Sequence, residues 1–93
     1  MDFEWDESKR VANKRKHGVD FNGLDGAFAD PYRIEAPEYV GNEGRWQLIA
    51  MAPAGLLYVV NVERRRDVIR IISARRATSR EARTYYSSQT DPR

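Results

Sequence analysis

The chain has 93 residues, of which 41% are hydrophobic and 32% charged, and it carries a net charge of +2. This length holds one domain, and this balance of apolar and charged residues argues against intrinsic disorder. The absence of cysteine excludes disulfide bonds and thiolate metal sites, so we expect a cytoplasmic protein. The polar start MDFEWDESKR does not resemble a signal peptide, and no apolar run approaches the ~20 residues that span a membrane.

The charges are unevenly distributed along the chain. Residues 9–17 contain five lysines and arginines without a carboxylate, and residues 64–83 contain eight arginines against two carboxylates. Residues 20–43 are acidic, with six carboxylates against one arginine. The sequence therefore predicts one positive and one negative surface, and a polyanion is the natural partner of the positive one.

Two helices are expected at the N-terminal end. Asp6 is suited to the N-cap and Gly18 to the left-handed position after the C-terminus, which predicts a helix over residues 7–17. Asp20 is suited to the N-cap of a second, short helix that ends before Pro31 and places Phe21, Leu24 and Phe28 on one face.

After Pro31 the sequence becomes rich in β-formers. A weak strand is predicted over 33–36, followed by strands over 45–51, 56–64 and 68–75. The connections at 53–55 and 65–67 are short enough for hairpins, which predicts an antiparallel meander. The segment 56–62 is apolar on both faces and is expected to be the central strand.

The C-terminal part is predicted to be a helix. Thr78 and Glu81 match a capping box, which indicates a helix start, and residues 88–93 are expected to fray. In the preceding strand, strict alternation would place Arg70, Ile72, Ala74 and Arg76 on one face and Ile69, Ile71, Ser73 and Arg75 on the other. The fold class is thus α+β in a single domain over 1–93, with two N-terminal helices, a three- or four-stranded antiparallel meander and a C-terminal helix.

Several kinds of chemistry find no support in the sequence. His17 is the only histidine, which excludes a zinc site with two histidines, and the carboxylates lack calcium-loop spacing. Neither a glycine-rich phosphate loop nor a nucleophile elbow is present, so we expect no metal and no cofactor. Proton transfer and cation chemistry remain, and metal-free RNA cleavage needs only a base, an acid and cations.

Two places could supply these groups. Asn13, Lys16 and His17 share one stripe at the end of the first helix, where the helix dipole favours positive charge. Arg75 and Arg76 end the last strand just before a helix N-terminus, a position that also favours a phosphate. The alternative is that His17 only caps its helix and that both arginines are solvated.

Further candidates have equally ordinary alternatives. Glu63 and Arg64 end the preceding strand and could act as an acid–base and phosphate pair, or form a weak surface ion pair. The aromatic side chains could stack on bases or fill the core; these are Trp5, Trp46, Tyr58, Tyr85 and Tyr86.

Several blocks of the sequence resemble the BrnT toxin family. The two longest are Lys16-His17-Gly18-Val19, preceded by Asn13, and Arg70-Ile71-Ile72-Ser73-Ala74-Arg75-Arg76-Ala77 with Glu81. Shorter blocks are Phe3-Glu4-Trp5-Asp6, Phe21 and Phe28-Ala29-Asp30-Pro31. The resemblance spans nearly the whole chain, and the combination of the two long blocks is specific.

The resemblance implies a RelE-like fold, a growth-arresting ribonuclease, and neutralisation by a ribbon-helix-helix antitoxin of the BrnA type that contacts operator DNA. RNA is then the substrate and the antitoxin a partner in a hetero-oligomer. The positions expected to carry catalysis are Lys16, His17, Glu63, Arg64, Arg75 and Arg76. The cations expected to bind RNA are Lys9, Lys14, Arg45 and Arg70.

Two other functions stay open from the sequence. The chain could be an inactive interaction module that acts as a co-repressor with its DNA-binding antitoxin. It could also bind RNA or DNA without cleaving it, which the arginine clusters alone would explain.

Overall fold

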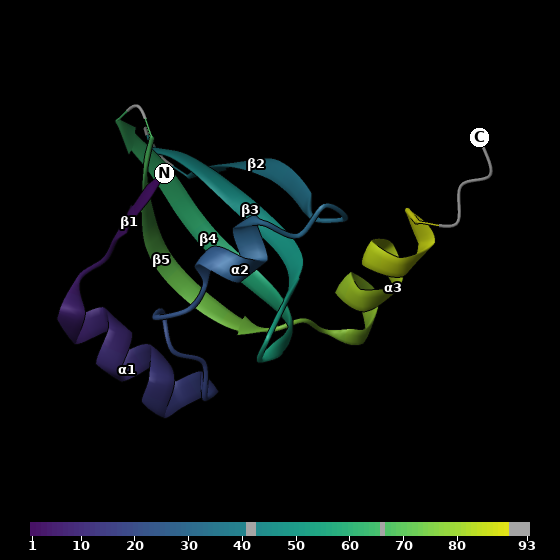
Figure 1. The fold of residues 1–93 in the computed structure, drawn as a ribbon, viewed down its shortest axis with the longest axis horizontal. Helices are drawn as coiled ribbons and strands as arrows, with labels where there is room; N and C mark the ends of the chain where they lie inside the picture. The colour runs from purple at the N-terminus through teal and green to yellow at the C-terminus, as the bar shows by residue number, and fades with distance from the viewer. Residues whose placement is uncertain (41–42, 66, 90–93) are drawn as a thin grey trace.

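The computed structural model describes residues 1–40, 43–65 and 67–89, except for the side chains of 39, 40, 43, 64 and 65. Within them the chain forms five strands and three helices (Figure 1). In chain order they are β1 (Asp2–Glu4), α1 (Glu7–His17), α2 (Asp25–Phe28), β2 (Ile34–Val40), β3 (Glu43–Ala52), β4 (Gly55–Arg65), β5 (Val68–Arg76) and α3 (Ser79–Ser87). No helix in this part of the chain is long and apolar enough to cross a membrane.

All five strands join one sheet in the order β1-β5-β4-β3-β2. The antiparallel meander from β2 to β5 is confirmed, and β4 is the central strand as expected. The prediction of only three or four antiparallel strands is wrong, because β1 adds a fifth strand parallel to β5 and makes the sheet mixed. A strand of three residues is too short for its alternation to be recognised in the sequence.

The predicted ends of α1 and the predicted start of α3 are confirmed by their caps. Asp6 accepts a hydrogen bond of 2.9 Å from the Ser8 N–H, and Gly18 adopts a φ of 72° that lets its N–H close the last turn of α1. Thr78 and Glu81 form both hydrogen bonds of the capping box of α3. Of the tail expected to fray, residues 90–93 lie outside the described residues.

The predicted start of α2 is wrong. α2 begins at Asp25, after Leu24, and has no side-chain cap. Asp20 instead accepts the Asn22 N–H at 3.0 Å and forms an ion pair with Arg10. Gly23, with a φ of 91°, lies outside helical conformation and separates Asp20 from the helix.

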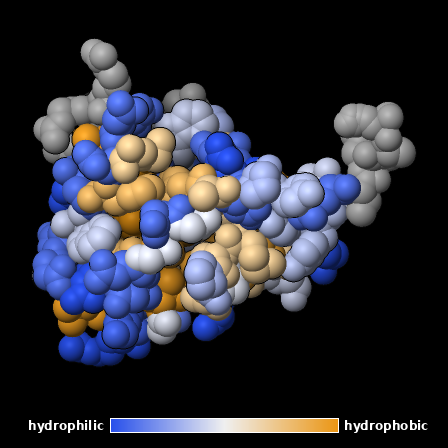
Figure 2. Space-filling model, in the orientation of Figure 1, coloured by the Kyte–Doolittle hydropathy of each residue, from blue (hydrophilic) through white to orange (hydrophobic). Residues whose placement is uncertain are grey.

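One face of the sheet carries the hydrophobic core. The segment 19–28 packs on this core face, and in Figure 1 α2 lies in front of the sheet. The buried side chains contributed by the sheet are Leu48, Ala50, Leu57, Val59, Ile71 and Ala74. Figure 2 shows apolar surface over the middle of the molecule and hydrophilic surface over α1 at the lower left.

A β-bulge at Ile72 changes the side-chain pattern of β5. Val60 pairs with Ser73, but the next residue, Asn61, pairs with Ile71. The extra residue brings Ile71 and Ala74 to the same face, where they are 1% and 0% exposed. The predicted alternation, which separated these two residues, is therefore wrong, because a single bulge reverses every side chain beyond it.

Asn13 joins α1 to the edge of β5 beyond the end of β1. Its amide Nδ2 donates to the carbonyls of Val19 and Ala74 at 2.9 and 2.8 Å, and its Oδ1 accepts the Ala74 N–H at 3.2 Å. The side chain is buried. Within the predicted polar stripe of Asn13, Lys16 and His17, Asn13 is therefore buried and fixes α1 beside the strand, so it is not available to a ligand.

Candidate active site

The C-terminal turn of α1 and the end of β5 lie at the same end of the molecule (Figure 1). The Asn13–Ala74 hydrogen bonds fix the two elements side by side. His17 is one turn beyond Asn13, about 6 Å along the helix, and Arg76 is two residues beyond Ala74, about 7 Å along the strand. The structure thus brings the two predicted groups of cations to one region of the surface.

Lys16 and His17 are available to a ligand. Lys16 is exposed and His17 half-buried, and within residues 1–40, 43–65 and 67–89 neither side chain forms a hydrogen bond or ion pair. The last turn of α1 also contains Lys14 and Arg15. Four cationic or potentially cationic side chains therefore surround the C-terminal end of α1, where the helix dipole favours positive charge, and together they can attract an anionic ligand.

Arg75 is held by three groups. Its Nη1 and Nη2 donate to the two carboxylate oxygens of Glu81, both at 2.9 Å, and its Nη1 also donates to the Arg76 carbonyl at 3.2 Å. The guanidinium lies over the ring of Tyr58, 4.0 Å from its centre. The hydrogen bond with Arg75 lowers the pKa of Glu81, and the same bond raises the pKa of Arg75, so both groups are charged at neutral pH.

Arg76 points to the face opposite Arg75, as the alternation of a strand requires. Its Nη1 donates to the Ala54 carbonyl at 2.7 Å in the β3–β4 turn. Gly55 has a φ of 125°, and a Cβ there would lie 3.1 Å from that guanidinium. Arg76 therefore fixes this turn, although its exposed side chain still has donors for a phosphate.

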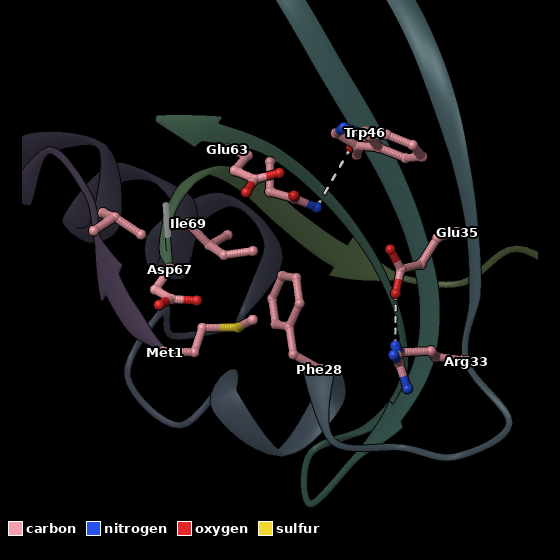
Figure 3. A pocket seen from close by; sticks show the side chains of 10 residues that line it. Met1, Phe28, Arg33, Glu35, Trp46, Glu63, Asp67 and Ile69 are labelled. Carbon is pink, nitrogen blue, oxygen red and sulfur yellow. Dashed lines mark hydrogen bonds and ion pairs between the residues drawn. The ribbon is translucent and has the colours of Figure 1, made fainter. Parts of the chain in front are cut away.

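Glu63 lies apart from this region. It pairs with Ile69, whereas Tyr58 pairs with Arg75, so Glu63 is five residues, or roughly 17 Å, away along β4. It points to the core face and lines a pocket of about 300 Å³ together with Trp46 and Phe28 (Figure 3). The side chain of Arg64 lies outside the described residues.

The cations expected to bind RNA fall into two groups. Lys9 and Lys14 are exposed on α1, and the Lys14 Nζ lies 3.6 Å from the Asp20 Oδ2. Arg45 and Arg70 both lie beside Val62 in the sheet register, towards the end of the sheet that contains Glu63. Arg70 forms an ion pair of 3.2 Å with Glu4.

The aromatic side chains divide between core and surface. Trp5 packs edge-on against Phe21, with ring centres 6.1 Å apart, and Tyr85 is buried. Trp46 and Tyr86 are 38% and 50% exposed and remain open to stacking.

The sequence did not indicate the group around Arg75. From the sequence, Glu81 is a helix cap and part of the block that resembles the family, and Tyr58 is only one of several aromatic residues. Their contact with Arg75 depends on the register between β4 and β5, which the bulge at Ile72 alters. The one available signal was the short spacing from Arg75 to Glu81 across a helix start.

The described residues contain no cluster of three or more histidine, aspartate or glutamate side chains that could hold a metal ion. The arrangement at the end of β5 offers instead cations, an imidazole and a phenol, groups that bind phosphates and transfer protons.

Comparison with known proteins identifies the family. A family model described as the ribonuclease toxin BrnT of type II toxin–antitoxin systems matches residues 5–81. The chain belongs to the BrnT family. Among curated proteins no sequence matches significantly. The family is one of ribonuclease toxins, so an RNA substrate and an antitoxin partner follow for this BrnT chain.

A solved structure supports the same fold. The crystal structure of the Brucella abortus ribonuclease toxin BrnT superposes with a TM-score of 0.64 and 23% sequence identity. The match covers 85% of this chain and 99% of the Brucella chain. The α+β architecture of this BrnT-family chain is therefore shared with that protein.

Proposed function

We propose that the chain is a metal-independent endoribonuclease whose active site lies between the end of α1 and the end of β5. The observation that supports this most is the pair of Asn13–Ala74 hydrogen bonds, which brings Lys16 and His17 to the same end of the molecule as Arg75. In this site Lys16 and His17 exchange protons with the RNA, and Arg75 binds the scissile phosphate and stabilises its developing charge.

The reaction is an attack of the 2′-hydroxyl on the neighbouring phosphorus. A base takes the proton of the 2′-hydroxyl, an acid protonates the leaving 5′ oxygen, and cations stabilise the additional negative charge. The products carry 2′,3′-cyclic phosphate or 3′-phosphate ends. None of these steps requires a metal ion, so we expect full activity in the presence of a chelator such as EDTA.

The remaining predicted residues have supporting roles in this proposal. Arg76 adds positive charge near the scissile phosphate, while Arg64, Lys9, Lys14, Arg45 and Arg70 bind flanking RNA through charge. Glu63 is the weakest candidate for proton transfer because of its distance from Arg75 along β4. We expect its replacement to affect cleavage less than that of His17.

The partner in this proposal is a ribbon-helix-helix antitoxin of the BrnA type. The antitoxin covers the basic region of the toxin with acidic and apolar side chains and inhibits it by occlusion. Both proteins are cytoplasmic. The antitoxin contacts operator DNA, whereas the toxin does not. The sheet and helix order also support a RelE-like fold. A structure of the complex with His17 and Arg75 both open to solvent would contradict the occlusion.

Alanine replacement tests the active site. We expect His17→Ala and Arg75→Ala to lower RNA cleavage by about a hundredfold or more, because each removes a proton-transfer or phosphate-binding group. The measurement is the rate of product formation with a defined oligoribonucleotide. Arg83→Ala is the matched control, since Arg83 is an exposed cation on α3 with no role in the proposed site. Unchanged cleavage by His17→Ala would show that His17 is not part of the active site, and unchanged cleavage by Arg75→Ala would show the same for Arg75.

A second function is favoured by one observation. Arg75 is already engaged by Glu81 and stacked on Tyr58, as expected if it has a structural role in a chain that acts only as a co-repressor with its antitoxin. Expression without the antitoxin distinguishes the two functions, because an active ribonuclease arrests growth and a co-repressor does not.

A further inference from the structure

Tyr58 combines three features that the proposed reaction has not used. It lies on the central strand β4, on the face opposite the core, where Arg75 is its neighbour in the register. Its ring is half-buried beneath the Arg75 guanidinium. Its hydroxyl forms no hydrogen bond with any of the residues that the structure describes. A half-buried phenol usually has a hydrogen-bond partner. Because this hydroxyl has none among the described residues, it is free to bind a ligand.

Arg75 can bind a phosphate without losing its other contacts. A guanidinium has five N–H donors, and the hydrogen bonds to Glu81 and Arg76 use three of them. The Arg75 side chain is 34% exposed, and its other two donors form no hydrogen bond with the described residues. Because the guanidinium lies on the Tyr58 ring, a phosphate bound at its free edge comes beside the phenol.

The charges around Tyr58 determine which proton transfer it can perform. Burial raises the pKa of Tyr58, the charges of Glu38 and Glu81 raise it further, and only the charge of Arg75 lowers it. The phenol is therefore protonated at neutral pH and can act as an acid but not as a base. Once the proton has left, Arg75 stabilises the phenolate that remains.

We propose that Tyr58 is the general acid of the ribonuclease reaction and donates its phenolic proton to the leaving 5′ oxygen of a phosphate held by Arg75. This inference rests on the proposed function. The 2′ oxygen forms its bond to phosphorus as a base takes the 2′-hydroxyl proton, and the bond between phosphorus and the 5′ oxygen breaks. The Tyr58 proton passes to the 5′ oxygen, and the phenolate later regains a proton from water. Lys16 and His17 are then left with the role of base.

The experiment compares two leaving groups in one substrate. The linkage that the wild-type protein cleaves is first mapped, and an oligoribonucleotide is made with sulfur in place of the 5′ bridging oxygen at that linkage. A thiolate leaves without being protonated, so loss of a general acid slows cleavage of the oxygen substrate alone. Tyr58→Phe removes the hydroxyl and retains the ring beneath Arg75.

We expect Tyr58→Phe to cleave the oxygen substrate about a hundredfold more slowly than wild type and the sulfur substrate at nearly the wild-type rate. Tyr86→Phe, which removes an exposed hydroxyl, is the matched control and should leave both rates unchanged. Cleavage of the sulfur substrate by the same preparation also demonstrates that the variant is folded.

Two results would overturn the role of Tyr58 while leaving the ribonuclease function in place. The first is unchanged cleavage of the oxygen substrate by Tyr58→Phe. The second is equal slowing on both substrates, which would mean that the hydroxyl maintains the position of Arg75. If the wild-type protein cleaves neither substrate, the proposed function fails and the role of Tyr58 fails with it.

Discussion

Asn13 forms hydrogen bonds with the main-chain groups of Ala74, which lies on the edge of β5 beyond the end of β1. Its amide pairs with both the N–H and the C=O of Ala74, as a neighbouring strand would. The third hydrogen bond, to the Val19 carbonyl, fixes the chain as it leaves α1. One side chain therefore connects the helix that contains His17 with the strand that ends at Arg75.

Replacing Asn13 should destabilise the whole protein. In Asn13→Ala the buried N–H and C=O of Ala74 lose their partner, and we expect the free energy of unfolding to fall by about 2–4 kcal/mol. Urea denaturation measures this change. Asn22→Ala, at an exposed position, is the matched control, and similar losses in the two variants would contradict the role of the buried amide.

Tyr85 and Asp30 form a second buried contact. Asp30 accepts hydrogen bonds from the Tyr85 hydroxyl at 2.5 Å and from the Met51 and Tyr32 N–H groups. Burial alone would raise the pKa of Asp30, but these three hydrogen bonds outweigh it and lower the pKa. Burial and the hydrogen bond to Asp30 raise the pKa of Tyr85 to about 12.

Tyr85→Phe should lower the free energy of unfolding by about 1–3 kcal/mol, because a hydrogen bond to a charged acceptor is lost in the interior. Tyr86→Phe should have almost no effect. The wild-type advantage over Tyr85→Phe should hold below pH 10, the ordinary pKa of tyrosine, and decline as pH rises towards the raised pKa of about 12. An advantage that stays constant across this range, measured by urea denaturation, would contradict the assignment.

At the scale of elements, α3 is attached to the rest of the fold at two points. Figure 1 shows it projecting away from the sheet. Glu81 at its start bonds Arg75, and Tyr85 near its end bonds Asp30. Both points involve a carboxylate with a lowered pKa, so acid should weaken the attachment of the helix.

The sign of this effect follows from proton binding. Because the folded pKa of Glu81 is below its ordinary value of 4.5, the folded state binds fewer protons there than the unfolded state, and stability is lost as pH falls through this range. Glu81→Gln cannot ionise but can still cap the helix. We expect wild type to be more stable than Glu81→Gln at pH 7 and the difference to vanish below the lowered pKa, as measured by urea denaturation. A difference that persists in acid would contradict this role of Glu81.

The ends of α1 and the start of α3 were predictable from the sequence, whereas the start of α2 and the details of the strands were not. The caps Asp6, Gly18 and Thr78 act through hydrogen bonds to residues within one turn of them, so their spacing in the sequence is sufficient. The pairing of β1 with β5 and the bulge at Ile72 depend on residues far apart in the chain. For the same reason the sequence indicated Arg75 but not its contact with Tyr58.

At the scale of the whole molecule, the uneven charge was visible in the sequence and its arrangement was not. Lys9, Lys14, Lys16 and His17 lie on α1, while Arg45 and Arg70 lie towards the far end of the sheet. The RNA in our proposal extends from the active site along one or both groups. The RelE-like assignment and the single-domain organisation over 1–93 stay predictions.

Salt dependence tests which group the RNA follows. Binding of an oligoribonucleotide to the His17→Ala variant should weaken steeply between 50 and 200 mM salt, because counterions are released from the phosphates, and each contact contributes about 0.7 to the logarithmic slope. Adding Lys9→Ala should lower that slope by about 0.7. The measurement is fluorescence anisotropy, with Arg70→Ala compared in parallel. An unaltered slope would place Lys9 away from the RNA.

The two edges of the sheet are poorly suited to accept another strand. β2 forms one edge and contains Pro37, which has no N–H to donate. On the other edge β1 is only three residues long. Beyond it, the Asn13 amide already forms hydrogen bonds with the N–H and C=O of Ala74 on β5. A binding protein that recognises this chain would therefore have to use side chains on a surface of the sheet or helices, and not extend the ladder of main-chain hydrogen bonds.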